Sequence, residues 1–244
     1  MRRFFVHSSA VHASQAVLTG PEYHHLRHVV RLQVGDPLAL RDERGTEYHG
    51  TLSHFSAQTA TIAIRSVAAV SPPSFALTLA LGLLKGAKLD LVIEKVTELG
   101  VHTIVPFFSA NTVVSLPQDR QAQRLTRWRR IAQSAAKQSG SHLPHITPPH
   151  SFAQLLDTAS DSETRLLFSE HEQTLSLRAF ADTHRTLSSL WIVIGSEGGF
   201  TPQEVDQARA AGFTPVSLGP SILRAETASI AAVSLCQYVW RQSS

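Results

Sequence analysis

Residues 194–200 read IGSEGGF, and residues 217–228 read SLGPSILRAETA. A hydrophobic run typical of a buried strand precedes each of these glycine-bearing segments. Loops that leave the carboxyl ends of neighbouring strands lie side by side at one edge of an α/β sheet, where small ligands bind. The two segments therefore predict an α/β domain with a ligand pocket between two loops.

A helix is expected between the two loops. Thr201 is typical of an N-cap, Pro202 of the first helical position and Glu204 of the third position in a capping box. Gly212 ends this helix, and a strand over Thr214–Leu218 follows directly. Each loop therefore begins where a predicted strand ends.

The composition indicates a folded protein of a reducing compartment. The chain has 244 residues, of which 43% are hydrophobic, enough for a substantial core. Cys236 is the only cysteine, which excludes an intramolecular disulfide and a zinc site built from cysteines. The apolar run after Arg3 is too short for a signal peptide, and no run is long enough to span a membrane. We therefore expect a cytoplasmic protein with no membrane partner.

Residues 1–70 alternate short strands with turns. A single helical stretch near Glu22–Arg31 interrupts them, and a run of short strands of this kind favours a small β-barrel. Ser71-Pro72-Pro73-Ser74 is the expected linker to a second domain over residues 75–244. The predicted strands are Arg3–Val6, Pro37–Arg41, Tyr48–Phe55 and Thr59–Val67.

After the linker, strands alternate with helices. The helix that follows the first strand carries its apolar residues on one face and stops at Gly100, and the chain closes on a helix over Thr227–Trp240. This alternation predicts a parallel α/β sheet behind the small β-domain. Besides Thr214–Leu218, the predicted strands are Phe75–Leu81, Thr103–Phe107, Thr164–Phe168 and Leu190–Ile194.

Basic side chains gather in one segment. The formal net charge is only +3, yet no acidic residue occurs between Asp119 and Asp157. Arg124 and Arg127 follow helical spacing in this window, while Trp128 and other apolar residues line a different face. The basic face could attract a polyanion, or it could be an ordinary solvated helix face.

The first glycine loop does not match the common phosphate-binding loops. Glu197 stands where a dinucleotide-binding loop has its second glycine, and the loop has no lysine for a P-loop. Ser196 follows Gly195 directly, which excludes the nucleophile elbow of α/β-hydrolases. A carboxylate in the loop suits a ligand with hydroxyls or a positive charge better than a pyrophosphate.

Both loops and several other segments resemble the RsmE family, the small-subunit ribosomal RNA uridine-N3 methyltransferases of the SPOUT superfamily. The resemblance rests first on residues 194–200 and 217–228, and it extends over nearly the whole chain. Further matching segments are His24–Arg31, Lys85–Gly86, Lys88–Asp90, Glu94–Val101 and Gln138–Gly140. Ser196 stands where many members have proline, and Ser221 where arginine is usual.

The resemblance implies an N-terminal PUA-like β-barrel and a C-terminal SPOUT-type parallel sheet with a deep trefoil knot. It also implies S-adenosylmethionine as methyl donor, a homodimer whose interface completes each active site, and 16S ribosomal RNA in the small subunit as substrate. Backbone groups of the two loops would then bind the donor. The expected donor-binding residues are Gly195, Glu197, Gly198, Leu218, Gly219, Ile222, Leu223 and Ala228.

Arg224 and Glu226 are the catalytic candidates. Methylation of uracil at N3 requires loss of the N3 proton, and a cation beside the developing anion would favour that loss. Arg224 could supply this cation, clamp a phosphate or pair with Glu226. Glu226 could accept the proton, hold Arg224 or stabilise the start of the closing helix. Glu197 could contact the ligand or organise its loop.

The RNA contacts are expected from basic residues of both domains. Each of them could also be a plain surface residue, and His24 and His28 lack the carboxylate that would complete a metal site. No metal is therefore expected. Two alternatives stay open: a related methyltransferase with another target nucleotide, and a non-catalytic RNA-binding or ribosome-assembly factor. The candidate RNA-binding residues are Arg2, Arg3, Arg27, Arg31, Arg124 and Arg127.

Overall fold

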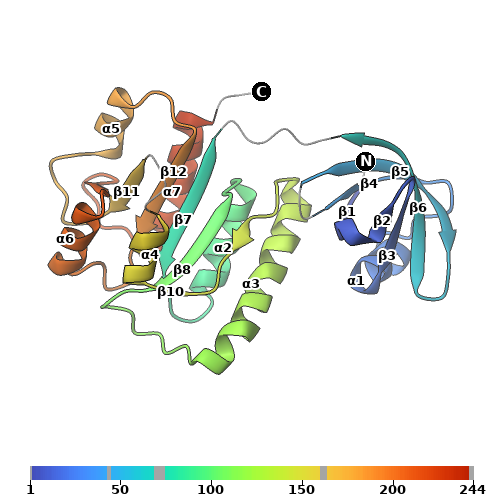
Figure 1. The fold of residues 1–244 in the computed structure, drawn as a ribbon, viewed down its shortest axis with the longest axis horizontal. Coiled ribbons are helices and arrows are strands. Elements are labelled where there is room, and N and C mark those ends of the chain that lie inside the picture. The colour runs from blue at the N-terminus through green and yellow to red at the C-terminus, as the bar shows by residue number, and fades with distance from the viewer. Residues whose placement is uncertain (1, 43–44, 69–74, 160–163, 242–244) are drawn as a thin grey trace. The chain divides into compact units, whose positions relative to one another are not determined.

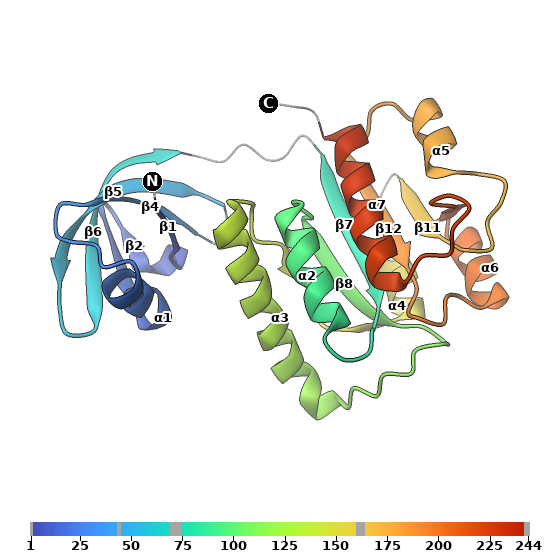
Figure 2. The same ribbon diagram turned by 180° about the vertical axis from the view of Figure 1, so that it is seen from behind.

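The computed structural model describes residues 2–42, 45–68, 75–159 and 164–241. The chain divides into two compact units, Met1–Pro72 and Pro73–Ser244, each with its own sheet. Figures 1 and 2 show the strands and helices of each unit from two sides. The expected linker, residues 71–74, lies outside the described residues.

The N-terminal unit is a six-stranded sheet in the order β1-β4-β5-β6-β3-β2. Its pairings are antiparallel except for β1 with β4, which is parallel. Gly50 lies at a register shift in β5, where an added Cβ would come within 2.4 Å of the Ala63 carbonyl oxygen. The strands are β1 (Arg2–Phe5), β2 (Val11–His12), β3 (Gln15–Thr19), β4 (Pro37–Arg41), β5 (Glu47–Phe55) and β6 (Thr59–Ala68).

The four strands predicted here are confirmed to within one residue at each end. β2 and β3 were not predicted, because β2 has only two residues and β3 carries polar residues at both of its ends. The predicted helix over Glu22–Arg31 is two segments, α1 (Gly20–His24) and a π-helical turn η2 (His25–Val29). A short 3₁₀ turn, η1 (Ser8–Ala10), precedes β2.

The C-terminal unit is a parallel sheet in the order β10-β8-β7-β12-β11-β13, with β9 paired to β8. The predicted parallel α/β domain is therefore confirmed, and β9 and β10 were missed because each has only two residues. The strands are β7 (Ala76–Gly82), β8 (Thr103–Phe108), β9 (His145–Ile146), β10 (His150–Ser151), β11 (Arg165–Phe168), β12 (Ser189–Ile194) and β13 (Thr214–Val216).

Helices cover both faces of this sheet (Figures 1 and 2). Leu77, Leu79 and Leu81 of β7 belong to a core that includes residues of α2, α3, α5 and α7. Ala80 belongs to a second core, which includes residues of α4 and α6. The helices are α2 (Lys88–Glu98), α3 (Gln118–Ser139), α4 (Phe152–Thr158), α5 (Leu177–Thr183), α6 (Pro202–Ala210) and α7 (Ala225–Trp240).

The predicted cap of α6 is present and also ties this helix to a distant loop. Thr201 and Glu204 form a capping box, with Pro202 at the first helical position. The buried Glu204 carboxylate accepts hydrogen bonds from the Thr201 backbone N–H at 2.9 Å and from the Ala110 backbone N–H at 2.7 Å. One side chain thus joins the loop after β12 to the loop after β8.

Glu204→Ala should lower the free energy of unfolding by about 2–3 kcal/mol, because it leaves the two backbone N–H groups without their charged acceptor. Urea unfolding followed by circular dichroism would measure this loss. Gln203→Ala is the matched control, since Gln203 is an exposed neighbour in the same helical turn. Its effect should stay within about 0.5 kcal/mol. Equal effects of the two substitutions would contradict a linking role for Glu204.

Candidate functional site

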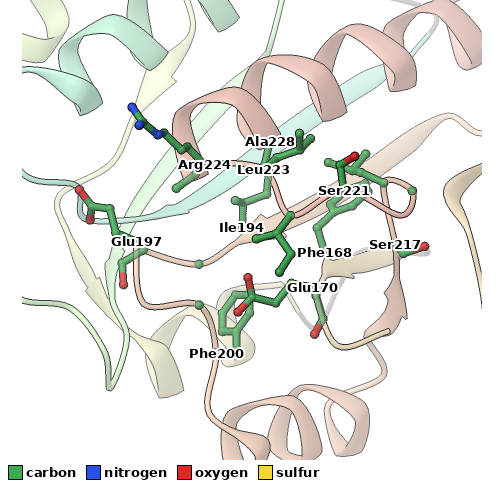
Figure 3. A pocket seen from close by; sticks show the side chains of 18 of the residues that line it. Phe168, Glu170, Ile194, Glu197, Phe200, Ser217, Ser221, Leu223, Arg224 and Ala228 are labelled. Carbon is green, nitrogen blue, oxygen red and sulfur yellow. The ribbon is translucent and has the colours of Figure 1, made fainter. Parts of the chain in front are cut away.

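A pocket of about 420 Å³ lies at the carboxyl ends of β11, β12 and β13. Figure 3 shows it from close by, with side chains of three loops around it. The two glycine-bearing loops after β12 and β13 form most of the wall, and the segment after β11 completes it. The lining residues are Lys88, Phe168, Ser169, Glu170, Ile194, Gly195, Ser196, Glu197, Gly199, Phe200, Ser217, Leu218, Gly219, Pro220, Ser221, Ile222, Leu223, Arg224, Ala225 and Ala228.

The first loop lies against the end of β7. An added Cβ at Gly82 would come within 2.4 Å of the Ser196 backbone nitrogen, so no side chain fits at that position. Two residues of the loop after β8 hold the same loop from another side. The Ser196 hydroxyl lies 3.3 Å from the Ser109 hydroxyl, and the Asn111 side chain donates to the Gly198 carbonyl at 2.8 Å.

The second loop is anchored through its first residue. The Ser217 backbone N–H donates to the Leu175 carbonyl, and the Ser217 carbonyl accepts from the Leu177 N–H. Gly219 has a φ of +126°, a conformation that L side chains rarely adopt. The loop ends at Arg224, which has extended backbone dihedrals and is the N-cap residue of α7. Ile222 is 79% exposed on this loop.

The Glu197 carboxylate is held by the start of α2. It accepts hydrogen bonds from the Lys85 backbone N–H at 3.0 Å and from the Lys88 ammonium at 3.1 Å. Burial would raise the pKa of Glu197, but the hydrogen bonds and the Lys88 charge outweigh it and hold that pKa below its usual value. In Figure 3 the Glu197 side chain points outward from the pocket. Its negative charge therefore interacts with Lys85 and Lys88 of the protein and does not face a ligand in the pocket.

Arg224 and Glu226 lie close together in the chain but do not pair within the described residues. Arg224 lines the pocket and is exposed. Glu226 is in the first turn of α7 and is not among the lining residues. Its buried Oε2 has no hydrogen-bond partner in the described part of the chain and lies 3.9 Å from the Lys88 ammonium. The predicted alternative of an Arg224–Glu226 pair is therefore absent from the described residues.

The expected donor-binding residues gather at this one pocket, with one exception. Gly195, Glu197 and the five candidates of the second loop and α7 line it, whereas Gly198 does not. Sequence reasoning missed Lys88 and the segment Phe168–Glu170. The signal for the segment was available, because the predicted strand over Thr164–Phe168 ends at the same sheet edge. The segment Phe168–Glu170 contains no glycine, so its sequence did not indicate a ligand-binding loop.

The candidate RNA-binding residues are divided between the two units, and four of them have partners within their unit. In the N-terminal unit Arg2 donates to the Val30 carbonyl at 2.9 Å, and Arg3 lies 3.8 Å from the Glu47 carboxylate. Arg27 stacks over the Phe55 ring at 4.1 Å from its centroid.

Arg127 of α3 is the fourth of these residues. It pairs with Asp90 at 2.7 Å, which raises the Arg127 pKa through the hydrogen bond and the opposite charge. Arg31 and Arg124 are exposed.

Two features are absent from the described residues. In that part of the chain, no three or more His, Cys, Asp or Glu side chains lie together as a metal site would require. The described helices also include none that combines the length and the apolar character needed to cross a membrane.

The comparisons with known proteins identify both units. Residues 71–237 match the family described as "RNA methyltransferase domain", and residues 18–65 match "RNA methyltransferase PUA domain". The Ribosomal RNA small subunit methyltransferase E of Bacillus subtilis (strain 168) is 33% identical over 98% of this chain and 96% of its own length.

Two solved structures are similar along nearly the whole chain. A Ribosomal RNA small subunit methyltransferase E from Neisseria gonorrhoeae bound to S-adenosyl methionine has 30% identity and a TM-score of 0.85, covering 98% of each chain. A methyltransferase from Legionella pneumophila, in complex with the bound cofactor SAM, has 26% identity and a TM-score of 0.86 over 99% of this chain and 98% of its own. With domain matches in both units and a relative that is 33% identical over 98% of this chain, the chain belongs to the ribosomal RNA small subunit methyltransferase E family.

Proposed function

We propose that this protein transfers a methyl group from S-adenosylmethionine to N3 of a specific uridine in the 16S ribosomal RNA of the small subunit. The observation that carries the proposal is the pocket between the two glycine loops. It occurs in a chain similar to a Neisseria gonorrhoeae enzyme whose structure contains S-adenosyl methionine. We place the activity in the cytoplasm, as a step of ribosome biogenesis.

The pocket fits an adenosyl ligand in size and in lining. Its volume of about 420 Å³ lies in the range of small-molecule sites, roughly 300–1,000 Å³. Apolar Phe168, Leu218 and Leu223 offer surfaces for a planar base. Gly195 and Gly219 lack side chains, so backbone N–H and C=O groups can approach the ligand closely. The loop residues expected from sequence, Glu197 and Ile222 among them, are proposed as the donor site on this basis.

The protein has little covalent chemistry to perform in this reaction. When bound, S-adenosylmethionine supplies an electrophilic methyl group, and the pocket must align it with the attacking N3. The Arg224 guanidinium has no hydrogen bond or ion pair with the other described residues, which leaves its charge available beside the pocket. We assign it to the developing negative charge on the uracil ring. Glu226 is proposed as the proton acceptor, with its buried oxygen near Lys88.

N3 lies on the Watson–Crick edge, so the target uridine must be unpaired or turned out of a helix. The exposed Arg31 and Arg124 are free to contact the surrounding phosphates. Arg2, Arg3, Arg27 and Arg127 would contribute while keeping their partners within the protein. The N-terminal PUA-like unit and α3 are therefore the proposed RNA-binding elements.

A homodimer with a knotted C-terminal unit is part of the proposal. Large apolar side chains are exposed on α7, where Tyr238 is 88% exposed and Leu235 and Val239 lie nearby. Leu91 is exposed on α2, the helix that packs against α7. Exposed large apolar side chains on two helices that pack together are typical of a subunit interface. The knot stays an expectation from the family resemblance.

Deletion of the gene in its host should remove one N3-methyluridine from the small-subunit RNA, and the purified protein should restore it in vitro. Mass spectrometry of nucleosides from mapped RNA fragments would measure both results. Assembled subunits and naked RNA should be compared as substrates, with subunits expected to be methylated faster. An unchanged N3 mark after deletion would reject the uridine target, and a change at another nucleotide would identify a different methyltransferase.

Arg224→Ala should lower the methylation rate about 100-fold, because the developing anion loses its cation. The dissociation constant for S-adenosylmethionine should change by less than about threefold, since the donor site is made mainly of backbone groups. Rapid-quench methylation assays and titration calorimetry would measure the two quantities. Arg224→Lys keeps the charge and should recover part of the rate. An equal loss of rate and donor affinity would assign Arg224 to donor binding.

Lys88→Ala should weaken donor binding by roughly fivefold, or about 1 kcal/mol, because it releases Glu197 and with it the first loop. Lys85→Ala is the matched control, since it removes the same charge one turn away while Lys85 contacts Glu197 only through its backbone N–H. Calorimetry with S-adenosylmethionine would compare the two variants. Equal weakening would mean that overall charge, and not the Lys88–Glu197 ion pair, supports the loop.

A further inference from the structure

We propose that Glu170 recognises the ribose hydroxyls of the methyl donor, on the condition that the proposed function holds. Glu170 lies two residues beyond the end of β11, the strand between β12 and β13, and lines the pocket together with the two glycine loops. In Figure 3 its carboxylate lies among the labelled residues that surround the cavity. Its side chain is 39% exposed, so the carboxylate is accessible to a ligand in the pocket.

The position of this carboxylate depends on a missing side chain. An added Cβ at Gly199 would lie 2.9 Å from Glu170 Oε1, closer than real Cβ contacts occur. Gly199 also has a φ of +63°, which favours glycine. The loop after β12 therefore leaves room for the Glu170 carboxylate to lie across it.

Glu170 differs from the other charged residues that line the pocket. Glu197 and Lys88 are joined to each other, and the Glu197 side chain points outward. Arg224 lies toward the start of α7. The ion-pair partner of Glu170 among the described residues is the exposed His171, at 3.6 Å, and no lysine or arginine of that part of the chain pairs with it. Its negative charge is thus available inside the pocket.

The chemistry of the donor decides which group this charge can bind. A carboxylate beside the sulfonium would stabilise the donor before reaction more than the transition state, in which that positive charge is leaving, and would slow transfer. The methionine tail carries its own carboxylate beside its ammonium, so it presents little net charge to Glu170. The ribose diol presents two O–H donors, and a carboxylate can accept both at once. The diol is therefore the group that fits.

Titration calorimetry with three ligands tests this assignment. The ligands are S-adenosylmethionine, 5′-methylthioadenosine, which keeps the ribose but has neither sulfonium nor amino-acid tail, and the 2′-deoxy form of 5′-methylthioadenosine. Glu170→Ala should weaken the first two by the same factor, about 10- to 100-fold, which corresponds to lost hydrogen bonds to a charged group. The wild-type protein should bind the 2′-deoxy form more weakly than its parent, and Glu170→Ala should not distinguish the two.

Asp206→Ala is the matched control, because Asp206 is an exposed carboxylate of α6 that does not line the pocket. It should leave all three affinities unchanged. Glu170→Gln keeps the shape and one acceptor and should lose less affinity than Glu170→Ala, and thermal unfolding of each variant would confirm that the fold is intact.

Two results would overturn the assignment of Glu170. Weakening of S-adenosylmethionine without weakening of 5′-methylthioadenosine would assign the carboxylate to the charged part of the donor. Unchanged binding of all ligands would show that Glu170 makes no contact with the donor. Failure of the wild-type protein to bind S-adenosylmethionine would instead reject the proposed function, and the role of Glu170 with it.

Discussion

The contact between Gly82 and the Ser196 backbone is the constraint on which the pocket depends. β7 and β12 are neighbours in the sheet, and the loop that leaves β12 folds back over the end of β7. A single Cβ at residue 82 would come within 2.4 Å of the Ser196 nitrogen and push this loop away. The loop carries Gly195 and Glu197, and its position determines whether Lys88 can reach the Glu197 carboxylate at 3.1 Å. The Lys88–Glu197 ion pair thus depends on the close backbone contact between Gly82 and Ser196.

Charges around the pocket perform two different tasks. The Lys88–Glu197 ion pair joins the loop after β12 to α2, and the capping residue Glu204 joins the same region to the loop after β8. These carboxylates accept hydrogen bonds from the protein and are therefore used to hold loops. Of the other charged lining residues, Glu170 has its carboxylate among the side chains around the cavity, whereas the Arg224 side chain extends away from it beside the start of α7. For the proposed reaction, in which a cationic donor meets a weakly acidic base, both kinds of charge would be needed, because loops must be held still before charges can act on the substrate.

Reasoning from sequence alone assigned more arginines to RNA binding than the folded protein leaves without partners. Each basic residue of the N-terminal unit or of α3 looks equally available for RNA when only the chain is considered. Asp90 neutralises Arg127 and Phe55 covers Arg27, and these partners are 37 and 28 positions away along the chain. Ion pairs and stacking between distant residues leave no local pattern, so Arg31 and Arg124 could be distinguished from the others only in the folded protein.

Local signals in the sequence determined most elements of the C-terminal unit, the α6 capping box and the two glycine loops, because capping, periodicity and glycine conformations act over a few residues. The tertiary structure alone decided that β11 lies between β12 and β13, and so that Glu170 faces the pocket. It also decided that Lys88, and not Arg224, lies near Glu226. Strand order and side-chain pairing across a sheet depend on contacts between segments far apart in the chain, and no short stretch of sequence contains that information.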